Sequence, residues 1–266
     1  MKTKFILSTF VIFLLIFSCK KEVVKTDSIY KFKEYISYTT SGIVSKSTTI
    51  DISLAKDVEG WEANQEISAN ILAVKPYVSG KVRVVNKHAF IFTPDESLEA
   101  DTEYSVTVKL NDIYKNIPQE FKQYTFQFKT ITPNFNIEMQ ALQSYSKEFQ
   151  YLEGILKSAD VISLDNAKKM IEVSQGNHQK TIVWNESYKK AKVFDFKIDS
   201  IQRFEEDSKL QIQWNGKAIN VENKGGNEIL IPGKNNFKVI SVNVNNVGEQ
   251  YISINFSDAL KKQQNF

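Results

Sequence analysis

Few residues in this 266-residue chain have side chains suited to catalysis or metal binding. There is one cysteine, Cys19, and there are two histidines, His88 and His178. A single cysteine excludes a disulfide framework within the chain, and a zinc site built from cysteine and histidine needs more ligands than these. The lone thiol lies at the edge of an apolar leader, which also excludes a cysteine protease. The two histidines are far apart in the sequence, so we interpret each as a surface residue.

Other patterns that carry chemistry do not occur in the sequence. There is no Gly-x-Ser-x-Gly nucleophile elbow, and we interpret the pair Gly225-Gly226 as a turn, not as a phosphate-binding loop. The acidic clusters Asp95-Glu96 and Glu205-Glu206-Asp207 lack the alternating ligand spacing of a calcium loop, which favours solvated turns. The sequence therefore predicts a protein that is not an enzyme, with no cofactor and no metal site.

Residues 1–18 have the features of a secretory signal peptide. Lys2 and Lys4 precede an apolar run from Phe5 to Phe17, which spans roughly 20 Å as a helix and is shorter than the ~30 Å of bilayer hydrocarbon. The run ends in Ile16-Phe17-Ser18-Cys19, which resembles a bacterial lipobox. This resemblance implies cleavage before Cys19 and a diacylglycerol on its thiol, so that a lipid would attach the protein to a membrane. The alternative is an incidental cysteine after an ordinary signal peptide.

The charge balance does not indicate a strongly charged partner. The chain has 34 basic and 31 acidic residues, and removal of Lys2 and Lys4 with the leader would leave 32 basic residues and a formal net charge of +1. No basic stripe interleaved with aromatic residues occurs, so we expect no nucleic acid as a partner. Residues 19–34 are expected to form a polar tether whose Lys20 and Lys21 either contact anionic headgroups or are solvated.

Alternating apolar and polar residues predict a mainly β protein. The runs are short and separated by turn residues, and each has one apolar face, as antiparallel sheets with one side on a core require. The predicted strands include residues 50–54, 104–110, 124–128, 135–139, 194–198, 210–214 and 252–256. This pattern is typical of tandem antiparallel β-sandwiches. The segment 163–175 instead has apolar residues at helical spacing, with Ser163 as N-cap and Gly176 as C′ residue, which predicts a short helix near 164–175.

Clusters of turn residues indicate where the domains end. We expect a first sandwich over residues 35–131 and a second over residues 132–236. Residues 250–260 are similar to residues 48–58, so residues 237–266 are expected to begin a third sandwich. Two or three strands are too few for an independent core. Either the chain is a fragment with a truncated third sandwich, which we favour, or these strands belong to the second sandwich.

A composite pattern of turn and core residues runs through residues 78–110. Pro94 ends one strand because it cannot donate a hydrogen bond to the ladder, and Asp101-Thr102 turn the chain into the next. The complete pattern consists of Gly80, Phe92, Pro94, Leu98, Thr102, Tyr104, Val106 and Val108. It resembles the bacterial Ig-like domain found in S-layer proteins and at the front of bacterial alpha-2-macroglobulins. The resemblance covers roughly residues 35–130 and implies an Ig-like fold there.

Residues 194–219 and 237–260 resemble the N-terminal region of alpha-2-macroglobulin-type lipoproteins from Bacteroidetes-like bacteria. The resemblance implies a lipid anchor in the inner or outer membrane of a Gram-negative cell, an Ig-like domain and a row of macroglobulin-type sandwiches. Members of this family trap proteases through a bait region and a Cys-Gly-Glu-Gln-type thioester. Here Gly248-Glu249-Gln250 follows Val247, so no thioester can form at this place.

The resemblance implies a non-catalytic, lipid-anchored cell-envelope protein. It would be the anchoring and scaffold part of an alpha-2-macroglobulin-like protease trap, with proteases or envelope proteins as partners in a full-length context. The alternative is a stand-alone surface lipoprotein that binds a glycan or a protein through loops at one end of a sandwich. Trp61 lies in a loop-like stretch after Glu59-Gly60, and it is the candidate binding residue for this alternative.

Overall fold

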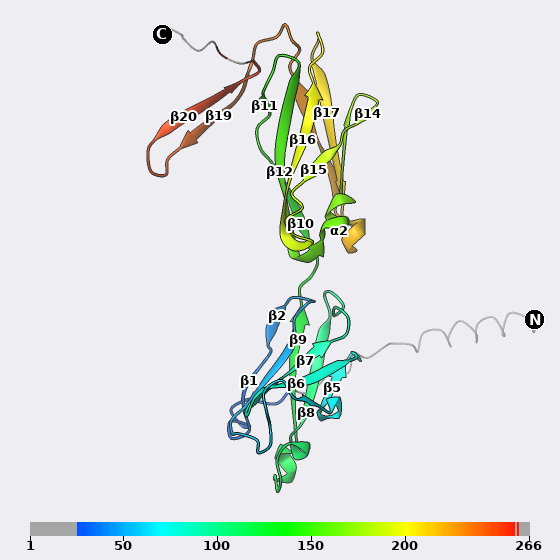
Figure 1. The fold of residues 1–266 in the computed structure, drawn as a ribbon, viewed down its shortest axis with the longest axis vertical. Coiled ribbons are helices and arrows are strands. Elements are labelled where there is room, and N and C mark those ends of the chain that lie inside the picture. The colour runs from blue at the N-terminus through cyan, green and yellow to red at the C-terminus, as the bar shows by residue number, and fades with distance from the viewer. Residues whose placement is uncertain (1–25, 259, 261–266) are drawn as a thin grey trace, which may run out of the picture.

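The computed structural model describes residues 26–258 and residue 260. They form two β-sandwiches joined end to end, followed by a two-stranded hairpin (Figure 1). The predicted fold class, mainly β with tandem antiparallel sandwiches, is confirmed. None of the helices in these residues is both long and apolar enough to cross a membrane. The predicted signal peptide and Cys19 lie outside the described residues.

The first sandwich consists of two sheets. One has the strand order β1-β3-β7-β6-β4 and the other β2-β9-β8-β5; β2 runs parallel to β9, and the other pairs are antiparallel. The strands are β1 (Ile36–Thr39), β2 (Gly42–Val44), β3 (Ile50–Leu54), β4 (Glu66–Ile67), β5 (Leu72–Lys75), β6 (Gly80–Asn86), β7 (Ala89–Pro94), β8 (Glu103–Lys109) and β9 (Gln123–Thr130), with 3-10 helices η1 (Ala69–Ile71), η2 (Leu110–Asp112) and η3 (Gln119–Phe121).

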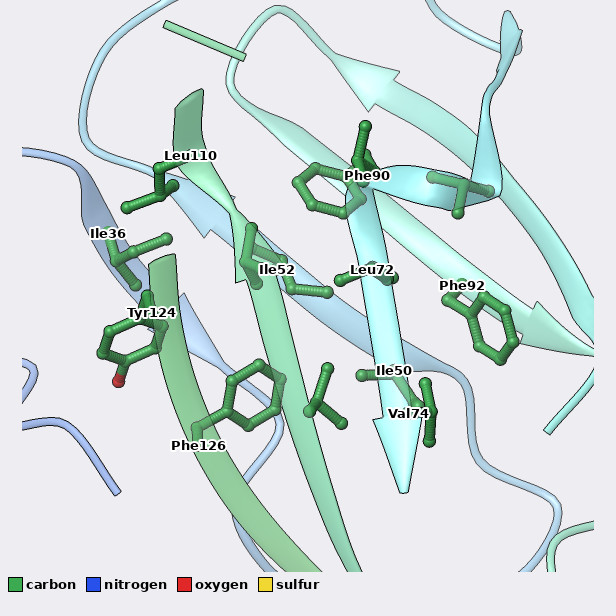
Figure 2. Packing of buried hydrophobic residues seen from close by; sticks show 14 of the residues in the cluster. Ile36, Ile50, Ile52, Leu72, Val74, Phe90, Phe92, Leu110, Tyr124 and Phe126 are labelled. Carbon is green, nitrogen blue, oxygen red and sulfur yellow. The ribbon is translucent and has the colours of Figure 1, made fainter. Parts of the chain in front are cut away.

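Alternate residues of these strands form the core between the two sheets. Figure 2 shows apolar side chains from both sheets meeting in this core, among them Ile52 and Phe90 from one sheet and Leu72 and Phe126 from the other. The structure also explains Gly80: a Cβ atom there would lie 2.5 Å from the Phe92 ring. The glycine and the phenylalanine of the sequence pattern are therefore required together, because the ring covers the glycine.

The first sandwich begins earlier in the chain than predicted. The tether was expected to extend to residue 34, but Asp27 already joins β9: its N–H donates to the Thr125 carbonyl, and its carboxylate accepts from the Thr125 N–H, both at 2.8 Å. Phe32 is 1 % exposed and packs against Phe121 and Tyr124. The prediction was wrong for residues 27–34 because this segment has no strand periodicity, although its aromatic ring belongs to the core.

The second sandwich also consists of two sheets. One has the order β10-β12-β16-β15, with β11 paired to β12, and the other has the order β14-β13-β17-β18. The elements are β10 (Phe135–Met139), β11 (Gln143–Ser144), β12 (Phe149–Ser163), α2 (Leu164–Lys168), β13 (Ile171–Gln175), β14 (His178–Gln179), β15 (Ile182–Trp184), β16 (Lys190–Gln202), β17 (Ser208–Asn215), the 3-10 helix η4 (Lys217–Ile219) and β18 (Lys224–Ile231). Its own core cluster is separate from that of the first sandwich.

The helix predicted near 164–175 is present only in its first half. Ser163 caps α2, as predicted, by accepting a hydrogen bond from the Asn166 N–H at 3.1 Å. The prediction was wrong for residues 171–175, which form β13 and pair with β17 from Ile171 to Gln175. Ile171 and Val173 also alternate with polar residues, so pairing with a neighbouring strand overrides the weak helical spacing. Gly176, with φ +58°, lies in the turn between β13 and β14 instead of ending a helix.

The interpretation of Gly225 and Gly226 as a turn was wrong. They lie within β18, opposite Trp214 and Gln213 of β17. The indole of Trp214 covers Gly225 so closely that a Cβ atom there would lie 2.9 Å from the ring. Gly225 therefore makes room for an aromatic ring on a neighbouring strand, whereas a Cβ atom at Gly226 would lie 3.0 Å from the Ile212 carbonyl oxygen.

Residues beyond the second sandwich form the hairpin of β19 (Val239–Asn245) and β20 (Tyr251–Phe256). Figure 1 shows this hairpin extending away from the second sandwich, to which it is joined at its base. These two strands lie in the region predicted to begin a third sandwich, and they form a two-stranded sheet of their own. A third sandwich stays a prediction.

Candidate functional site: the joints of the chain

The two sandwiches are connected by a linker of a few residues and by a carboxylate. Strand β9 ends at Thr130 and β10 begins at Phe135. Across this joint, the hydroxyl of Ser45 donates to Oδ1 of Asp160 at 2.6 Å, and the N–H of Lys46 donates to Oδ2 at 2.8 Å. Both oxygens of one side chain in the second sandwich therefore hold the segment after β2 in the first.

An irregularity in β12 positions Asp160. The pairing of β12 with β16 shifts register between Lys157 and Ile162, so the intervening residues leave the regular ladder. Within this segment, the N–H of Ala159 donates to the Asn134 carbonyl at 2.9 Å, which ties β12 to the linker. Such bulges bend a strand and redirect its side chains. Asp160 thereby points at the neighbouring sandwich and not at the core of its own.

The pKa of Asp160 lies below the ordinary value of an aspartate. Burial opposes the charge and would raise the pKa, but hydrogen bonds from Ser45, Lys46 and the Val161 N–H outweigh it, with help from the charge of Lys192. Hydrogen bonds to the charged form favour ionisation in this way. The joint is therefore held by a carboxylate that is ionised at neutral pH.

The loop before β8 supports the first sandwich's side of the joint. The N–H of Leu98 donates to the Lys46 carbonyl at 2.8 Å. The hydroxyl of Tyr104, which is buried, accepts from the Glu99 N–H at 2.9 Å. Asp101 has φ +52° and pairs with Lys129 at 2.6 Å, and this hydrogen bond lowers the pKa of the Asp101 carboxyl. Leu98 and Tyr104, which belong to the Ig-like sequence pattern, thus stabilise the segment that Asp160 binds.

A cleft of about 290 Å³ lies in the joint, with Leu98, Pro133, Asp160 and Ile219 among its lining residues. Ser45 and Asp160 are in contact there, but neither histidine is near. His88 lies in the turn between β6 and β7, where its Nδ1 is 3.2 Å from Asp57, and His178 lies in β14 of the other sandwich. Among the described residues no three His, Cys, Asp or Glu side chains gather as a metal site would require. The arrangement can hold two domains together through the Asp160 carboxylate.

A second joint connects the second sandwich to the hairpin. Arg203 is fully buried, and its guanidinium binds the Asp258 carboxylate through Nη1 at 2.6 Å and Nη2 at 3.2 Å. The same guanidinium donates to the carbonyls of Pro232 and Gly233 at 3.0 and 2.7 Å. The Arg203 hydrogen bond is the largest cause of the lowered pKa of Asp258. One buried arginine thus ties together the end of β16, the segment after β18 and the base of the hairpin.

Sequence reasoning missed both Asp160 and Arg203, although a signal was present. In β12 every second residue from Leu152 to Leu156 is buried, and Asp160 lies an even number of residues further along the strand. It therefore occupies a position where the pattern predicts an apolar residue. A charged residue at a core position needs a specific partner. Arg203 likewise follows the buried Ile201 at an interval of two. The charged residues at these otherwise apolar positions form the two joints.

Trp61, the predicted binding residue, packs against the core of the first sandwich. Its ring meets that of the buried Phe90 edge-to-face, with centroids 5.6 Å apart. The side chain is half-buried, so only part of the indole faces solvent. A binding role for Trp61 stays a prediction. The lipidation of Cys19 also stays a prediction, since that residue lies outside the described part of the chain.

Comparisons with known proteins agree with the fold of the first sandwich. Residues 27–130 match the family described as "Bacterial Ig-like domain", which agrees with the Ig-like β-sandwich that these residues form. No curated protein matches the chain. Among solved structures, the chain is similar to an L,D-transpeptidase from Mycobacterium tuberculosis H37Rv, with 10 % identity over 60 % of this chain and 73 % of that chain. The TM-score of 0.26 is too low for any conclusion about activity.

Proposed function

We propose that the protein is a non-catalytic, lipid-anchored protein of the bacterial cell envelope, in which the two sandwiches form a stiff spacer. The observation that supports a stiff spacer is the carboxylate of Asp160, whose two oxygens bind the Ser45 hydroxyl and the Lys46 N–H across the joint. A domain pair connected only by a linker is expected to move freely. A pair held by charge-assisted hydrogen bonds keeps one orientation.

The lipid anchor is supported by the sequence Ile16-Phe17-Ser18-Cys19 after the apolar run. Because Asp27 is already held by β9, only a short segment would separate the lipid from the first sandwich. The spacer would then begin at the membrane surface, with the Ig-like domain nearest to it. One acyl chain holds a protein only marginally, whereas two or more give stable anchoring.

Metabolic labelling with a fatty acid tests the anchor. The wild-type protein is expected to take up label and to remain with the membranes, whereas Cys19→Ser removes the thiol that would carry the lipid and is expected to abolish labelling. His88→Ser, a change in an exposed turn, serves as the control and is expected to label normally. Undiminished labelling of Cys19→Ser would refute the anchor.

We further propose that this spacer is the anchoring and scaffold part of an alpha-2-macroglobulin-like protease trap, without the thioester itself. The support is the resemblance of residues 194–219 and 237–260 to such lipoproteins. An immunoblot of membranes of the native bacterium with an antibody to residues 27–130 tests the assignment. A band several times larger than 30.5 kDa is expected. A band near 30 kDa would contradict it and leave a small envelope lipoprotein.

A further inference from the structure

The end of the first sandwich that lies away from the joint carries a connected group of aromatic rings. The ring centroids of Phe32 and Phe121 are 5.2 Å apart, and the Tyr35 centroid lies 5.3 Å from that of Phe121 and 5.6 Å from that of Tyr114. Phe32 and Tyr35 belong to the turns before β1, and Phe121 belongs to η3, just before β9. Strand β9 leads from here to the joint, so the green segment with η2 and η3 lies at the opposite end of the sandwich (Figure 1).

Two lysines lie on these rings. The ammonium group of Lys31 is 5.6 Å from the centroid of Phe121, and that of Lys56 is 5.6 Å from the centroid of Tyr35. Such cation–π contacts hold an exposed charge over an aromatic ring. Lys33 is exposed two residues after Lys31, and within the described residues none of these three lysines forms an ion pair. Their positive charges are therefore available to an outside partner.

An exposed tyrosine lies next to these lysines. Tyr30 is 85 % exposed, although it directly precedes Lys31 in the same turn. A tyrosine among lysines is typical of the membrane–water interface, where the ring lies at the level of the headgroups and the ammonium groups reach the lipid phosphates. Glu34 and Asp57 follow two of the lysines, so the net charge is modest and Tyr30 supplies the apolar part of such a contact. Tyr30, Lys31, Lys33 and Lys56 are named here the tip surface.

The chain limits how far the tip surface can lie from a lipid on Cys19. Asp27 is fixed to Thr125 of β9 by two hydrogen bonds. Cys19 and Asp27 are eight residues apart, and a fully extended chain covers at most ~3.6 Å per residue, about 29 Å in all. The sequence between them, residues 20–26, contains three lysines and one glutamate, so it is also attracted to anionic headgroups. With the anchor in place, the tip surface therefore stays within reach of the membrane.

We propose that the tip surface lies on the anionic headgroups of the membrane that holds the anchor, so that the two sandwiches project away from it. This inference rests on the proposed lipid on Cys19. Attraction to an anionic surface falls off within a Debye length, so the lysines gain from it only when the first sandwich stands on this end. Because Asp160 holds the joint, the second sandwich follows the orientation of the first.

Fluorescence quenching in vesicles tests the proposal on the full-length, lipidated protein. Ser28→Cys places a thiol beside the tip surface, and Tyr77→Cys places one towards the joint, because Lys75 pairs with Ser105 near the start of β8. Each variant is labelled with bimane and reconstituted in vesicles of phosphatidylcholine and phosphatidylglycerol that contain a lipid with a nitroxide on its headgroup. Bimane at residue 28 is expected to lose most of its fluorescence, and bimane at residue 77 is expected to keep it.

Substitutions in the tip surface separate a specific contact from mere closeness to the lipid. Tyr30→Ser with Lys33→Gln, added to Ser28→Cys, should remove most of the quenching at residue 28. Tyr77→Ser with Lys75→Gln is the matched control, since these side chains are also exposed, and it should leave the quenching unchanged. Vesicles of phosphatidylcholine alone should quench residue 28 less, because they offer no anionic headgroup. Equal unfolding temperatures would show that the variants remain folded.

The parent protein without an added cysteine separates failure of the anchor from failure of the tip surface. A lipid on the thiol of Cys19 leaves this protein without a free thiol, so it should float with the vesicles and take up no bimane. Labelling of the parent, or its failure to float, would refute the anchor and this inference with it. If the parent floats unlabelled, two results would overturn the tip surface alone: equal quenching at residues 28 and 77, or quenching that is unchanged by Tyr30→Ser with Lys33→Gln.

Discussion

Asp160 and Ser45 lie 115 residues apart in the sequence, and their side chains meet at 2.6 Å between the two sandwiches. The second oxygen of the same carboxylate binds the N–H of Lys46. Because the donors belong to one sandwich and the acceptor to the other, the bond specifies the orientation of the pair and adds little to either core.

Replacement of Asp160 is expected to loosen the joint. Asp160→Asn keeps the size of the side chain but removes the charge and one of its two acceptors. Hydrogen bonds to charged groups contribute about 1.5–3 kcal/mol, and we expect a loss of about 2 kcal/mol from the free energy that holds the two sandwiches together. Small-angle X-ray scattering should show a broader range of orientations, and proteases should cut within residues 131–134 faster.

Asp195→Asn is the control for this experiment, since Asp195 lies on the exposed side of β16. In a double-mutant cycle, Ser45→Ala and Asp160→Asn should show a coupling of about 1 kcal/mol, as contacting residues do. Unchanged scattering and proteolysis in Asp160→Asn would show that the linker and the cleft contacts hold the joint without the carboxylate.

Arg203 is expected to be essential for the second joint. Arg203→Ala would remove the guanidinium that donates to Asp258 and to the carbonyls of Pro232 and Gly233, and breaking a buried pair in this way costs about 3–5 kcal/mol. Urea denaturation followed through tryptophan fluorescence measures the loss, since Trp184 and Trp214 both pack in the second sandwich. Arg203→Lys is expected to recover only part of it, because one ammonium group cannot reach all of these acceptors.

The surface pair Lys209–Glu228 provides a comparison for Arg203. Its nitrogen–oxygen distance is 2.7 Å, but both side chains are about half exposed. Lys209→Ala is therefore expected to change the stability by less than about 1 kcal/mol. If Arg203→Ala were equally mild, the hairpin would not depend on the buried guanidinium.

Acid is expected to weaken the second sandwich near the hairpin. Hydrogen bonds from the Gly233 N–H, Lys238 and Asn236 lower the pKa of Asp207 from 3.8 to about 2. A carboxyl with a lowered pKa stabilises the folded state above its unfolded pKa, and this contribution is lost as the pH falls through the folded value. The unfolding temperature should therefore decrease between pH 3.8 and about pH 2.

Asp207→Asn isolates this contribution. The variant should unfold at a lower temperature than the wild type at neutral pH. Between pH 3.8 and about pH 2, its unfolding temperature should decrease by less than that of the wild type. Glu206→Gln, at the neighbouring exposed position, serves as the control, and its unfolding temperature should decrease with acid as much as that of the wild type. An identical acid profile for the wild type and Asp207→Asn would contradict the assignment.

Gly154 is expected to tolerate no side chain, because the ring of Phe196 covers it. A Cβ atom at this position would lie 2.4 Å from the end of the ring. Gly154→Ala should destabilise the second sandwich by about 1–3 kcal/mol, as overpacking of a core does. Thermal unfolding monitored by circular dichroism measures the effect.

Phe196→Leu provides the matched background for this substitution. In that background the end of the ring that covers residue 154 is absent, so the added methyl group of Gly154→Ala should cost less than it does beside Phe196. Equal costs in both backgrounds would show that the strain comes from the backbone of β12 and not from the ring.

The alternation of apolar and polar residues was sufficient to predict the fold class and most strands. Strand periodicity is a local property, because successive side chains point to opposite faces of a sheet. For this reason β3, β8, β9, β10, β17 and β20 could be located before any partner was known. The apolar leader before Cys19 could be read in the same local way.

Tertiary structure decided the joints and the exceptions to the pattern. Residues 171–175 become a strand because β17 lies beside them, and residues 27–34 join the first sandwich because Thr125 accepts and donates there. Asp160 and Arg203 acquire their roles from groups that the chain brings together only on folding. A local pattern specifies which face of a strand is apolar, but the partner of a buried charge is specified by contacts between distant segments, which no local pattern contains.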